Sequence, residues 1–325
     1  MAIIAQDIVT EYGAYYIKSE QNQQRLRRLL LFGRETTKIA RQIKTEDTVY
    51  RMATSSLSPV VQPFQKTFTP KGDLTFKPNP IPLYNIKADL LLYPDDIKNS
   101  WLAFLESENF DRRQWPLIRY IMENHLIQKI EDDMETKAYY LGVRVEPVSG
   151  TASDPEKSMN GLQYLLKNNT GINRLTMDPL EASTIYDQIE ETYEQVSEVY
   201  QSKQMLICLA PKWQRAFLRD KRAQGYYQYT TPGQIDNTLD FSPAKVHALP
   251  SMIGTDDIFI TPYQNLVHVT KYGANSAKFE VEKVDRSVKI YTDWYEGFGF
   301  ELNEVVWTNV SAPAPAPEPA EPEED

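Results

Sequence analysis

The chain has 325 residues, of which 41% are hydrophobic and 25% are charged, a composition typical of folded domains rather than disordered chains. At about 150 residues per domain, this length predicts about two domains. The net charge is −10, and Ser311–Asp325 holds five of the acidic residues and no basic one. The mild charge of the rest argues against a protein that grips nucleic acid through its net charge.

Cysteine and histidine are too sparse for the common metal sites. Cys208 is the only cysteine, so neither an intramolecular disulfide nor a Cys-based zinc cluster can form. Its apolar neighbours indicate a small hydrophobic residue rather than a nucleophile. His125, His247 and His268 lie far apart in sequence and show no metal-ligand spacing. We therefore expect no metal and no cofactor.

Signals for export or membrane insertion are missing from the sequence. Met1–Thr10 lacks the basic and apolar regions of a signal peptide. The longest apolar stretches, such as Met205–Ala210, are far shorter than the roughly 20 residues of a membrane span. We expect a soluble protein made in a cytoplasm, with no membrane partner.

The two ends of the chain differ in character. Ser19 can cap a helix over Gln21–Phe32, and Gly33 fits the position after its end. Arg34–Arg51 is polar and basic-leaning, with only a weak helical period. Ser311–Asp325 is built of proline, alanine and glutamate, which predicts an extended, solvated tail, with partner binding as the alternative.

A β-hairpin is predicted in the proline-rich stretch Pro59–Pro94. Two apolar pairs at a period of two flank Thr69–Gly72, which fits a type I turn. The prolines of Lys77–Leu83 exclude that segment from a central strand. So few apolar residues cannot form a core, which predicts a projecting arm that finds a partner chain. The residues that we expect at this contact are Phe64, Phe68, Pro70, Lys71, Leu74 and Phe76.

Helices follow the hairpin. Pro94-Asp95-Asp96 opens one, with an apolar face at four-residue spacing. Pro116–Leu141 predicts a second, amphipathic helix about 39 Å long, which Gly142 ends. His125 lies on its apolar stripe, and we interpret it as a packed, hydrogen-bonded core histidine.

A mixed lobe is predicted after the linker Ser149–Ser153. A short helix covers Asp154–Lys167, and Asp178–Glu181 starts another with a cap, a proline and an acid. The inner stripe of that helix would hold Ile185, Ile189, Val196 and Val199. Met205–Leu209 reads as a buried strand, and Pro211–Gly225 as a helix.

The last third of the chain predicts an antiparallel sheet with one buried face, since apolar residues alternate with polar ones. Asp285-Arg286 fits a connection between two of its strands, and Gly297-Phe298-Gly299 fits a bulge or bend. The expected strands are Ile258–Ile260, Leu266–Val269, Lys278–Val284, Ser287–Tyr291 and Phe298–Trp307.

Catalytic signatures are absent from the sequence: it has no phosphate-binding glycine loop, nucleophile elbow or zinc-protease motif. Three acid pairs remain. Asp95/Asp96 fits a helix start, Asp132/Asp133 an exposed helix face, and Asp256/Asp257 a turn before a strand. A metal or acid–base role for a pair is the alternative in each case.

A basic helix face is the last candidate site. Arg215, Arg219 and Arg222 fall on one face of the predicted helix, opposite Trp213 and Phe217. Three interpretations stay open, namely a solvated face, contact with acidic groups of a neighbouring subunit, and contact with nucleic acid. The last is the weakest, because no exposed aromatic residues are interleaved to stack on bases.

The order of these elements resembles the Hong Kong 97-type capsid fold of tailed-phage major capsid proteins. Leu249–Asp257 followed by Phe259–Pro262 resembles a stretch near the end of phage capsid sequences. Asp285–Ile290 followed by Asp293-Trp294 and Gly297–Phe300 does so too. Ala210–Arg222 fits the axial domain of such proteins, and the resemblance covers about Pro59–Trp307.

The resemblance implies an α+β fold with an N-terminal arm, an extended hairpin called the E-loop, a long spine helix, and peripheral and axial domains. The implied divisions are 1–58 for the N-terminal arm, 59–94 for the E-loop, 95–153 for the peripheral domain with its spine helix, 154–249 for mainly the axial domain, 250–310 for the returning peripheral sheet and 311–325 for a disordered tail.

The implied function is that of a structural subunit, not an enzyme. Hexamers and pentamers of the chain would build an icosahedral virion head, assembled in the host cytoplasm, around double-stranded DNA that is enclosed rather than specifically bound. Further implied partners are a portal protein, a separate scaffold, a maturation protease and a decoration protein. The alternatives are an encapsulin-like compartment shell on the same fold, an acid-pair hydrolase, and another virion part such as a connector or tail protein.

Overall fold

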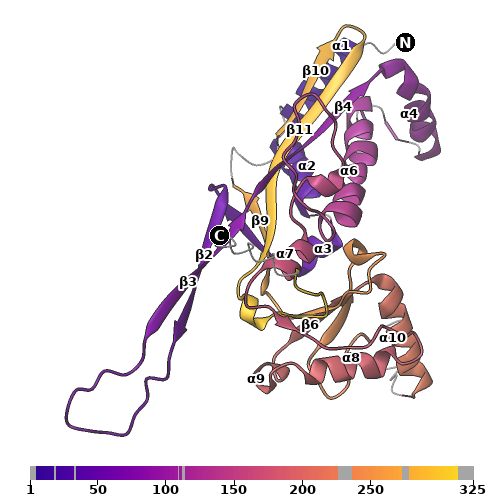
Figure 1. The fold of residues 1–325 in the computed structure, drawn as a ribbon. Coiled ribbons are helices and arrows are strands. Elements are labelled where there is room, and N and C mark those ends of the chain that lie inside the picture. The colour runs from indigo at the N-terminus through magenta and orange to yellow at the C-terminus, as the bar shows by residue number, and fades with distance from the viewer. Residues whose placement is uncertain are drawn as a thin grey trace, which may run out of the picture.

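A long sheet, a smaller sheet and a projecting hairpin make up the fold (Figure 1). The computed structural model describes residues 5–17, 20–32, 34–108, 110–111, 114–225, 236–272 and 278–313. The predicted cap Ser19 and the predicted end glycine Gly33 lie outside these residues. The helix between them is confirmed as α2, Glu20–Phe32.

The long sheet is organised around a single 14-residue strand, β11, Ser287–Phe300. It pairs antiparallel with β10 (Lys278–Val284), β4 (Tyr84–Leu92) and β9 (Leu266–Lys271). The prediction of two strands within 287–307 was therefore wrong. The Asp285-Arg286 connection is confirmed, and Asp285 has a φ of 52°.

Two segments of this sheet were missed in the sequence. β1, Arg41–Thr45, pairs parallel with β9, although its polar sequence predicts no strand. It follows α3, Glu35–Ile39, in the stretch where only a weak helical period was expected. β4 was missed as well. Helix α1 (Ala5–Tyr12, continued by a π-turn over Gly13–Ile17) packs on β10 and β11 and leads into α2, and α4 (Pro94–Glu108) follows β4 in the chain.

The long helix is confirmed, but it is wider than an α-helix. It runs through α5 (Leu117–Arg119), a π-segment (Tyr120–Leu126), α6 (Ile127–Asp133) and a second π-segment (Met134–Ala138). Positions at a constant spacing of four are buried along it, namely Ile118, Met122, Leu126, Ile130, Met134 and Ala138.

The π-segments explain why the prediction for His125 was wrong. At 3.6 residues per turn, His125 lies two turns after the buried Ile118 and on the same face, whereas the wider π-turns bring the next position, Leu126, onto that face instead. His125 is therefore exposed, and its ring lies edge-on to Tyr120 with centroids 4.8 Å apart. Leu141 of the predicted stripe is also exposed.

The second lobe contains a five-stranded sheet covered by helices. Its strand order is β5 (Asn173–Arg174), β12 (Trp307–Thr308), β8 (Phe259–Pro262), β6 (Met205–Leu209) and β7 (Lys245–Ala248). Its helices are α7 (Leu162–Asn168), α8 (Ile185–Glu194), α9 (Glu198–Gln201) and α10 (Pro211–Ala223). Short 3₁₀ turns cover Pro155–Lys157, Pro250–Met252 and Asn303–Val305.

Two helix predictions in this lobe need correction. The helix expected from Asp178 begins only at Ile185, because no side chain of 178–181 caps it and the preceding residues form turns. Val199 is exposed rather than buried. The helix expected over Asp154–Lys167 is two pieces, Pro155–Lys157 and α7. The strand β6 and the helix α10 are confirmed.

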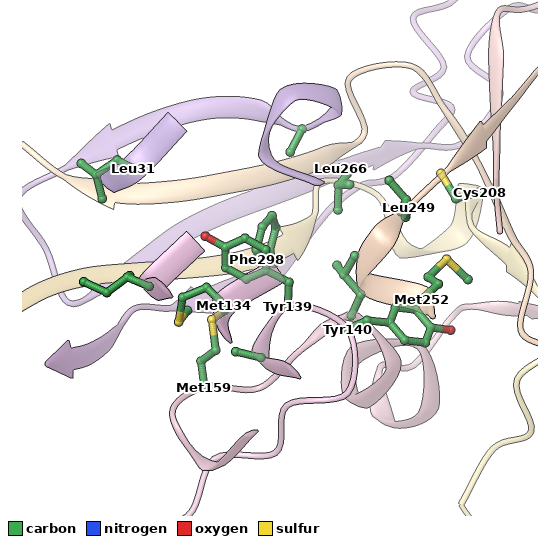
Figure 2. Close-up of a cluster of buried hydrophobic side chains, with 14 of the residues drawn as sticks. Leu31, Met134, Tyr139, Tyr140, Met159, Cys208, Leu249, Met252, Leu266 and Phe298 are labelled. Atoms are coloured by element: carbon green, nitrogen blue, oxygen red, sulfur yellow. The ribbon is translucent and has the colours of Figure 1, made fainter. Parts of the chain in front are cut away.

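One hydrophobic core joins the two lobes. Figure 2 shows its centre, where Tyr139 and Tyr140 from the end of the long helix meet Cys208 of β6, Leu266 of β9 and Phe298 of β11. All five side chains are almost fully buried. The lobes are therefore held together by shared packing rather than by a flexible linker.

The projecting hairpin consists of β2 (Val49–Leu57) and β3 (Leu74–Pro82), which pair only with each other (Figure 1). We call this ribbon with its loop, residues 49–82, the arm. The predicted hairpin is confirmed, but its first strand is β2, and Phe64 and Phe68 lie in the loop of residues 58–73. The prolines of β3 are compatible with a ribbon that has two open edges.

Candidate functional site

Two separate surfaces hold the residues that the sequence predicted at contacts. The end of the arm, residues 57–76, which we call the arm tip, carries Phe64, Phe68, Pro70, Lys71, Leu74 and Phe76. The outward side of α10, which we call the basic face, carries Arg215, Arg219 and Arg222. All nine side chains are exposed. Their roles in contacts remain predictions.

The loop of the arm tip is closed by polar contacts. Ser58 and Asp73 exchange two hydrogen bonds, from Ser58 N to Asp73 O at 3.2 Å and from Asp73 N to Ser58 Oγ at 2.7 Å. Lys71 Nζ donates to the carbonyl of Val61 at 2.8 Å, and Gln62 Nε2 donates to that of Thr69 at the same distance. The loop therefore keeps a shape without a core of its own.

The apolar side chains of the arm tip point into solvent. Phe64 is 93% exposed and Phe68 is 91% exposed. Leu57 and Leu74 lie opposite each other in the ribbon, and both are more than half exposed. Val60 and Val61, also exposed, were missed by the sequence reasoning, although their position beside a proline-rich loop was a usable signal. Contiguous apolar exposure of this kind marks an interaction surface.

The root of the arm is fixed to the long sheet. Ile81 and Leu83 form a small buried cluster with Val267 and Val269 of β9. Asn79 Nδ2 donates to the carbonyl of Phe300 at 2.6 Å. Packing and hydrogen bonding thus set the direction in which the arm leaves the body.

Two glycines of β11 make this close approach possible. A Cβ at Gly297 would overlap the carbonyl oxygen of Pro82, and one at Gly299 would overlap the side chain of Ile81. Both glycines remain in regular register with β9, opposite Val269 and Val267. The regular register excludes the bulge, one of the two predicted alternatives, and the crossing of the arm explains the glycines.

A buried charged cluster lies where the N-terminal segment, the long helix and the sheet meet. Glu296 is 0% exposed, and four side chains donate to its carboxylate. They are Arg34 Nη1 at 3.3 Å, Tyr139 OH at 2.9 Å, Trp294 Nε1 at 2.8 Å and His268 Nε2 at 3.1 Å. Burial by itself would raise the pKa of Glu296, but Arg34 and the hydrogen bonds outweigh it and lower that pKa.

This cluster connects segments that are remote in sequence, and it was not predicted. The sequence assigned no role to His268, which is fully buried and contacts both Glu296 and Gln42. A second buried link joins Thr36 to Glu135 of the long helix, where Thr36 Oγ1 donates to the carboxylate at 2.6 Å. Both links fasten the N-terminal segment to the body of the subunit.

The basic face lies opposite the buried side of α10, as predicted. Trp213 and Phe217 are buried beneath it. Lys221, on the inner side, is fully buried at its side chain, where it forms ion pairs with Asp236 at 2.8 Å and with Asp240 at 2.9 Å. The three arginines remain directed outward, available to a partner.

The acid pairs hold structural contacts. Asp95 and Asp96 lie in the first turn of α4, as predicted. Asp133 accepts ion pairs from Lys129 and Lys137, both at 3.0 Å. In the third pair, Asp256 Oδ1 accepts from Trp213 Nε1 at 2.8 Å, and Asp257 Oδ2 accepts from Tyr140 OH at 2.8 Å.

Cys208 and His247 are the remaining candidates for a catalytic or metal-binding role. Cys208 is completely buried, and burial raises the pKa of its thiol. His247 is half-buried, and burial followed by the nearby Lys245 lowers its pKa. Among the described residues no group of three or more acidic, histidine or cysteine side chains could hold a metal ion. In the same part of the chain, no helix is both long and apolar enough to cross a membrane.

The sequence matches no protein-family model. No curated protein matches it either. Solved structures with the same fold do exist. A chain of the satellite phage P4 procapsid including size determination (Sid) protein matches with a TM-score of 0.55 and 11% identity, over 91% of this chain and 100% of that chain.

Two GTA particles have the same architecture. The capsid of an empty GTA particle matches with a TM-score of 0.51 and 12% identity, over 83% of this chain and 87% of that chain. The capsid of a native GTA particle matches over the same shares with a TM-score of 0.50 and 11% identity. The chain therefore has the mixed helix-and-sheet fold of these capsid structures.

Proposed function

We propose that this chain is the structural major capsid subunit of a tailed phage. Copies of it would assemble as hexamers and pentamers into an icosahedral head that encloses double-stranded DNA. One observation carries the proposal: the arm exposes Phe64 and Phe68 beyond the reach of the core that its own chain provides. The fold that the chain shares with capsid structures supports it.

The energetics favour a partner for the arm. Burying one phenylalanine side chain contributes about 1.5–3 kcal/mol, so two at the arm tip are a large share of a subunit contact. The arm tip itself offers no core to bury them. Obligate interfaces often bury more than about 2,000 Å². The contact of the arm tip would therefore be one of many that together hold a shell.

The parts of the subunit take the following roles in this proposal. The arm, residues 49–82, is the E-loop that reaches over a neighbouring copy, and it overlaps the division 59–94 but begins before it. The helix of residues 117–138 is the spine of the peripheral domain, 154–249 is mainly the axial domain, and 250–310 returns to the peripheral sheet. A portal protein, a separate scaffold, a maturation protease and a decoration protein are the further partners that we propose.

Electron microscopy and light scattering on the purified full chain test the proposal. The chain is expressed first alone and then together with the products of neighbouring genes. We expect closed shells or six- and five-membered rings, and shells with DNA inside when packaging proteins are present. Shells filled with a protein cargo would instead favour a compartment. A monodisperse monomer under every condition would refute the proposal.

A further inference from the structure

The axial lobe has two charged faces of opposite sign. The basic face on α10 carries Arg215, Arg219 and Arg222. Three exposed acids, Glu191, Glu194 and Glu198, lie on the C-terminal half of α8 and on α9, and we call them the acidic face. In Figure 1, α10 lies along one side of the lobe, and α9 lies at the other.

No ion pair between described residues neutralises either face. None of the six side chains forms an ion pair with another residue that the structure describes. Residues 226–235, which follow the basic face in sequence, contain no charged residue that could offset it. Like charges at three- and four-residue spacing on a helix repel each other. This repulsion applies to the three arginines of α10 and to Glu191 and Glu194 of α8.

An exposed aromatic residue lies in a turn that is tied to the inner side of α10. Phe241 is fully exposed, and its φ of 57° is in the left-handed region that bulky residues rarely adopt. The neighbouring Asp240 forms its ion pair with Lys221 of α10, which ties this turn to the helix of the arginines. Ser242 Oγ donates to the carbonyl of Leu239 at 3.0 Å and closes the turn.

The backbone of Phe241 is strained without any gain of burial in its own chain. Strained residues that a structure holds in place cluster at functional sites. Aromatic residues and arginine are also among the residue types that dominate binding at protein interfaces. The acidic face has an apolar counterpart, because Val199 of α9 is exposed next to Glu198.

We infer that the basic face with Phe241 of one copy docks on the acidic face with Val199 of the next copy. This inference rests on the proposed shell function and specifies how the axial lobes would meet. The basic face cannot dock on itself, since like charges would oppose each other. A contact between two different faces is head-to-tail, and head-to-tail contacts form rings where the rotation between copies closes.

Reversing every charge on one face tests whether the basic face docks on the acidic face. This test does not require knowing which individual side chains meet. One variant carries Arg215→Glu, Arg219→Glu and Arg222→Glu, and a second carries Glu191→Arg, Glu194→Arg and Glu198→Arg. We expect each to need at least about tenfold more subunit for assembly than the wild type, because like-charge contacts replace attractive ones. A chain with all six changes should assemble at a subunit concentration within about threefold of the one that the wild type needs.

Mixing provides a sharper version of the test. The first variant has two acidic faces and the second has two basic faces, so a mixture of both can alternate around a ring. Alternation fits a six-membered ring but not a five-membered one. We therefore expect the mixture to recover six-membered rings and not five-membered ones under electron microscopy.

Phe241→Gly separates folding from assembly. Glycine adopts a positive φ without strain, so the thermal unfolding temperature should stay the same or rise. The subunit concentration needed for assembly should nevertheless rise by about tenfold, because the aromatic anchor is lost. This variant also keeps the inference testable if the six charge-reversing substitutions together impair folding.

Three outcomes would overturn the inference while leaving the proposed function intact. One is that wild-type shells form and both single-face variants assemble normally, and another is that wild-type shells form but the six-change chain is as defective as either variant. Normal assembly of Phe241→Gly would contradict the anchor. A wild-type chain that forms neither rings nor shells would instead contradict the proposed function, and the inference with it.

Discussion

Gly297 of β11 lies against the carbonyl oxygen of Pro82 in β3, in a space that no other residue type would leave free. This contact marks the point where the arm crosses the long sheet. Together with the packing of Ile81 on Val267 and Val269, it fixes the root of the arm, while the tip stays exposed. The arm thus combines a rigid base with an apolar end.

Gly297→Ala should destabilise the subunit by about 1–3 kcal/mol, because a methyl group would be forced against backbone atoms of Pro82. Gly299→Ala should also destabilise the subunit, since the added methyl group would overlap the buried side chain of Ile81. Denaturant unfolding of the purified chain measures both. Gly13→Ala is the control, because nothing lies within 4 Å of its added Cβ. Equal stability of Gly297→Ala and the control would contradict the tight crossing.

Replacing both Phe64 and Phe68 with serine should leave the free energy of unfolding of the subunit unchanged, since both side chains are more than 90% exposed. Assembly into rings or shells should be lost or strongly reduced, because the apolar contact of the arm tip would be gone. Light scattering and electron microscopy follow assembly. Val148→Ser, another exposed apolar position but in the linker, is the matched control. Undiminished assembly of the double variant would contradict a role for the arm tip.

Glu296→Gln should lower the free energy of unfolding at pH 7 by about 3–5 kcal/mol, because it leaves the buried Arg34 without its counter-charge. Glu301→Gln removes the half-exposed pair with Arg41 and should cost at most about 1 kcal/mol. Urea or guanidinium titration compares the two. Similar losses for both variants would contradict the buried pair.

The lowered pKa of Glu296 also sets a pH dependence. Its contribution to stability should be complete above the ordinary carboxyl pKa of 4.5 and should be lost as the pH falls through the lower pKa of the folded state. The stability of Glu296→Gln should therefore fall less steeply below pH 4.5 than that of the wild type. Parallel acid-unfolding curves for the two chains would show that another group controls this range.

Cys208 should not react with a thiol reagent such as Ellman's reagent while the protein is folded. The side chain is fully buried in β6, and burial raises the pKa of its thiol, so little reactive thiolate is accessible. One thiol per chain should react on unfolding, since no other cysteine exists. Fast labelling of the native protein would show that the core shown in Figure 2 opens readily.

Local sequence was sufficient where one short segment determines its own structure. Met205–Leu209 is a continuous apolar run, and Pro211 begins a helix with a buried stripe, so both elements could be predicted. The projecting hairpin could be inferred from its prolines. Its pairing could not, because β2 is held by the ladder with β3 and not by an apolar pattern.

Long-range contacts account for most of the misses. The cluster around Glu296 brings together Arg34, Tyr139 and His268, which nothing in the local sequence connects. The position of His125 depended on the π-segments of the long helix, which no local pattern reveals. Phe241, which we infer to take part in a contact between copies, lies in a turn that carried no predicted element.

An electron cryomicroscopy map of the assembled particle tests the central claim most directly, because it shows where the arm lies. The account predicts that residues 58–73 of each arm lie on another copy, with Phe64 and Phe68 buried in that contact. A particle in which the arm tips extend freely into solvent, with both phenylalanines uncovered, would contradict it.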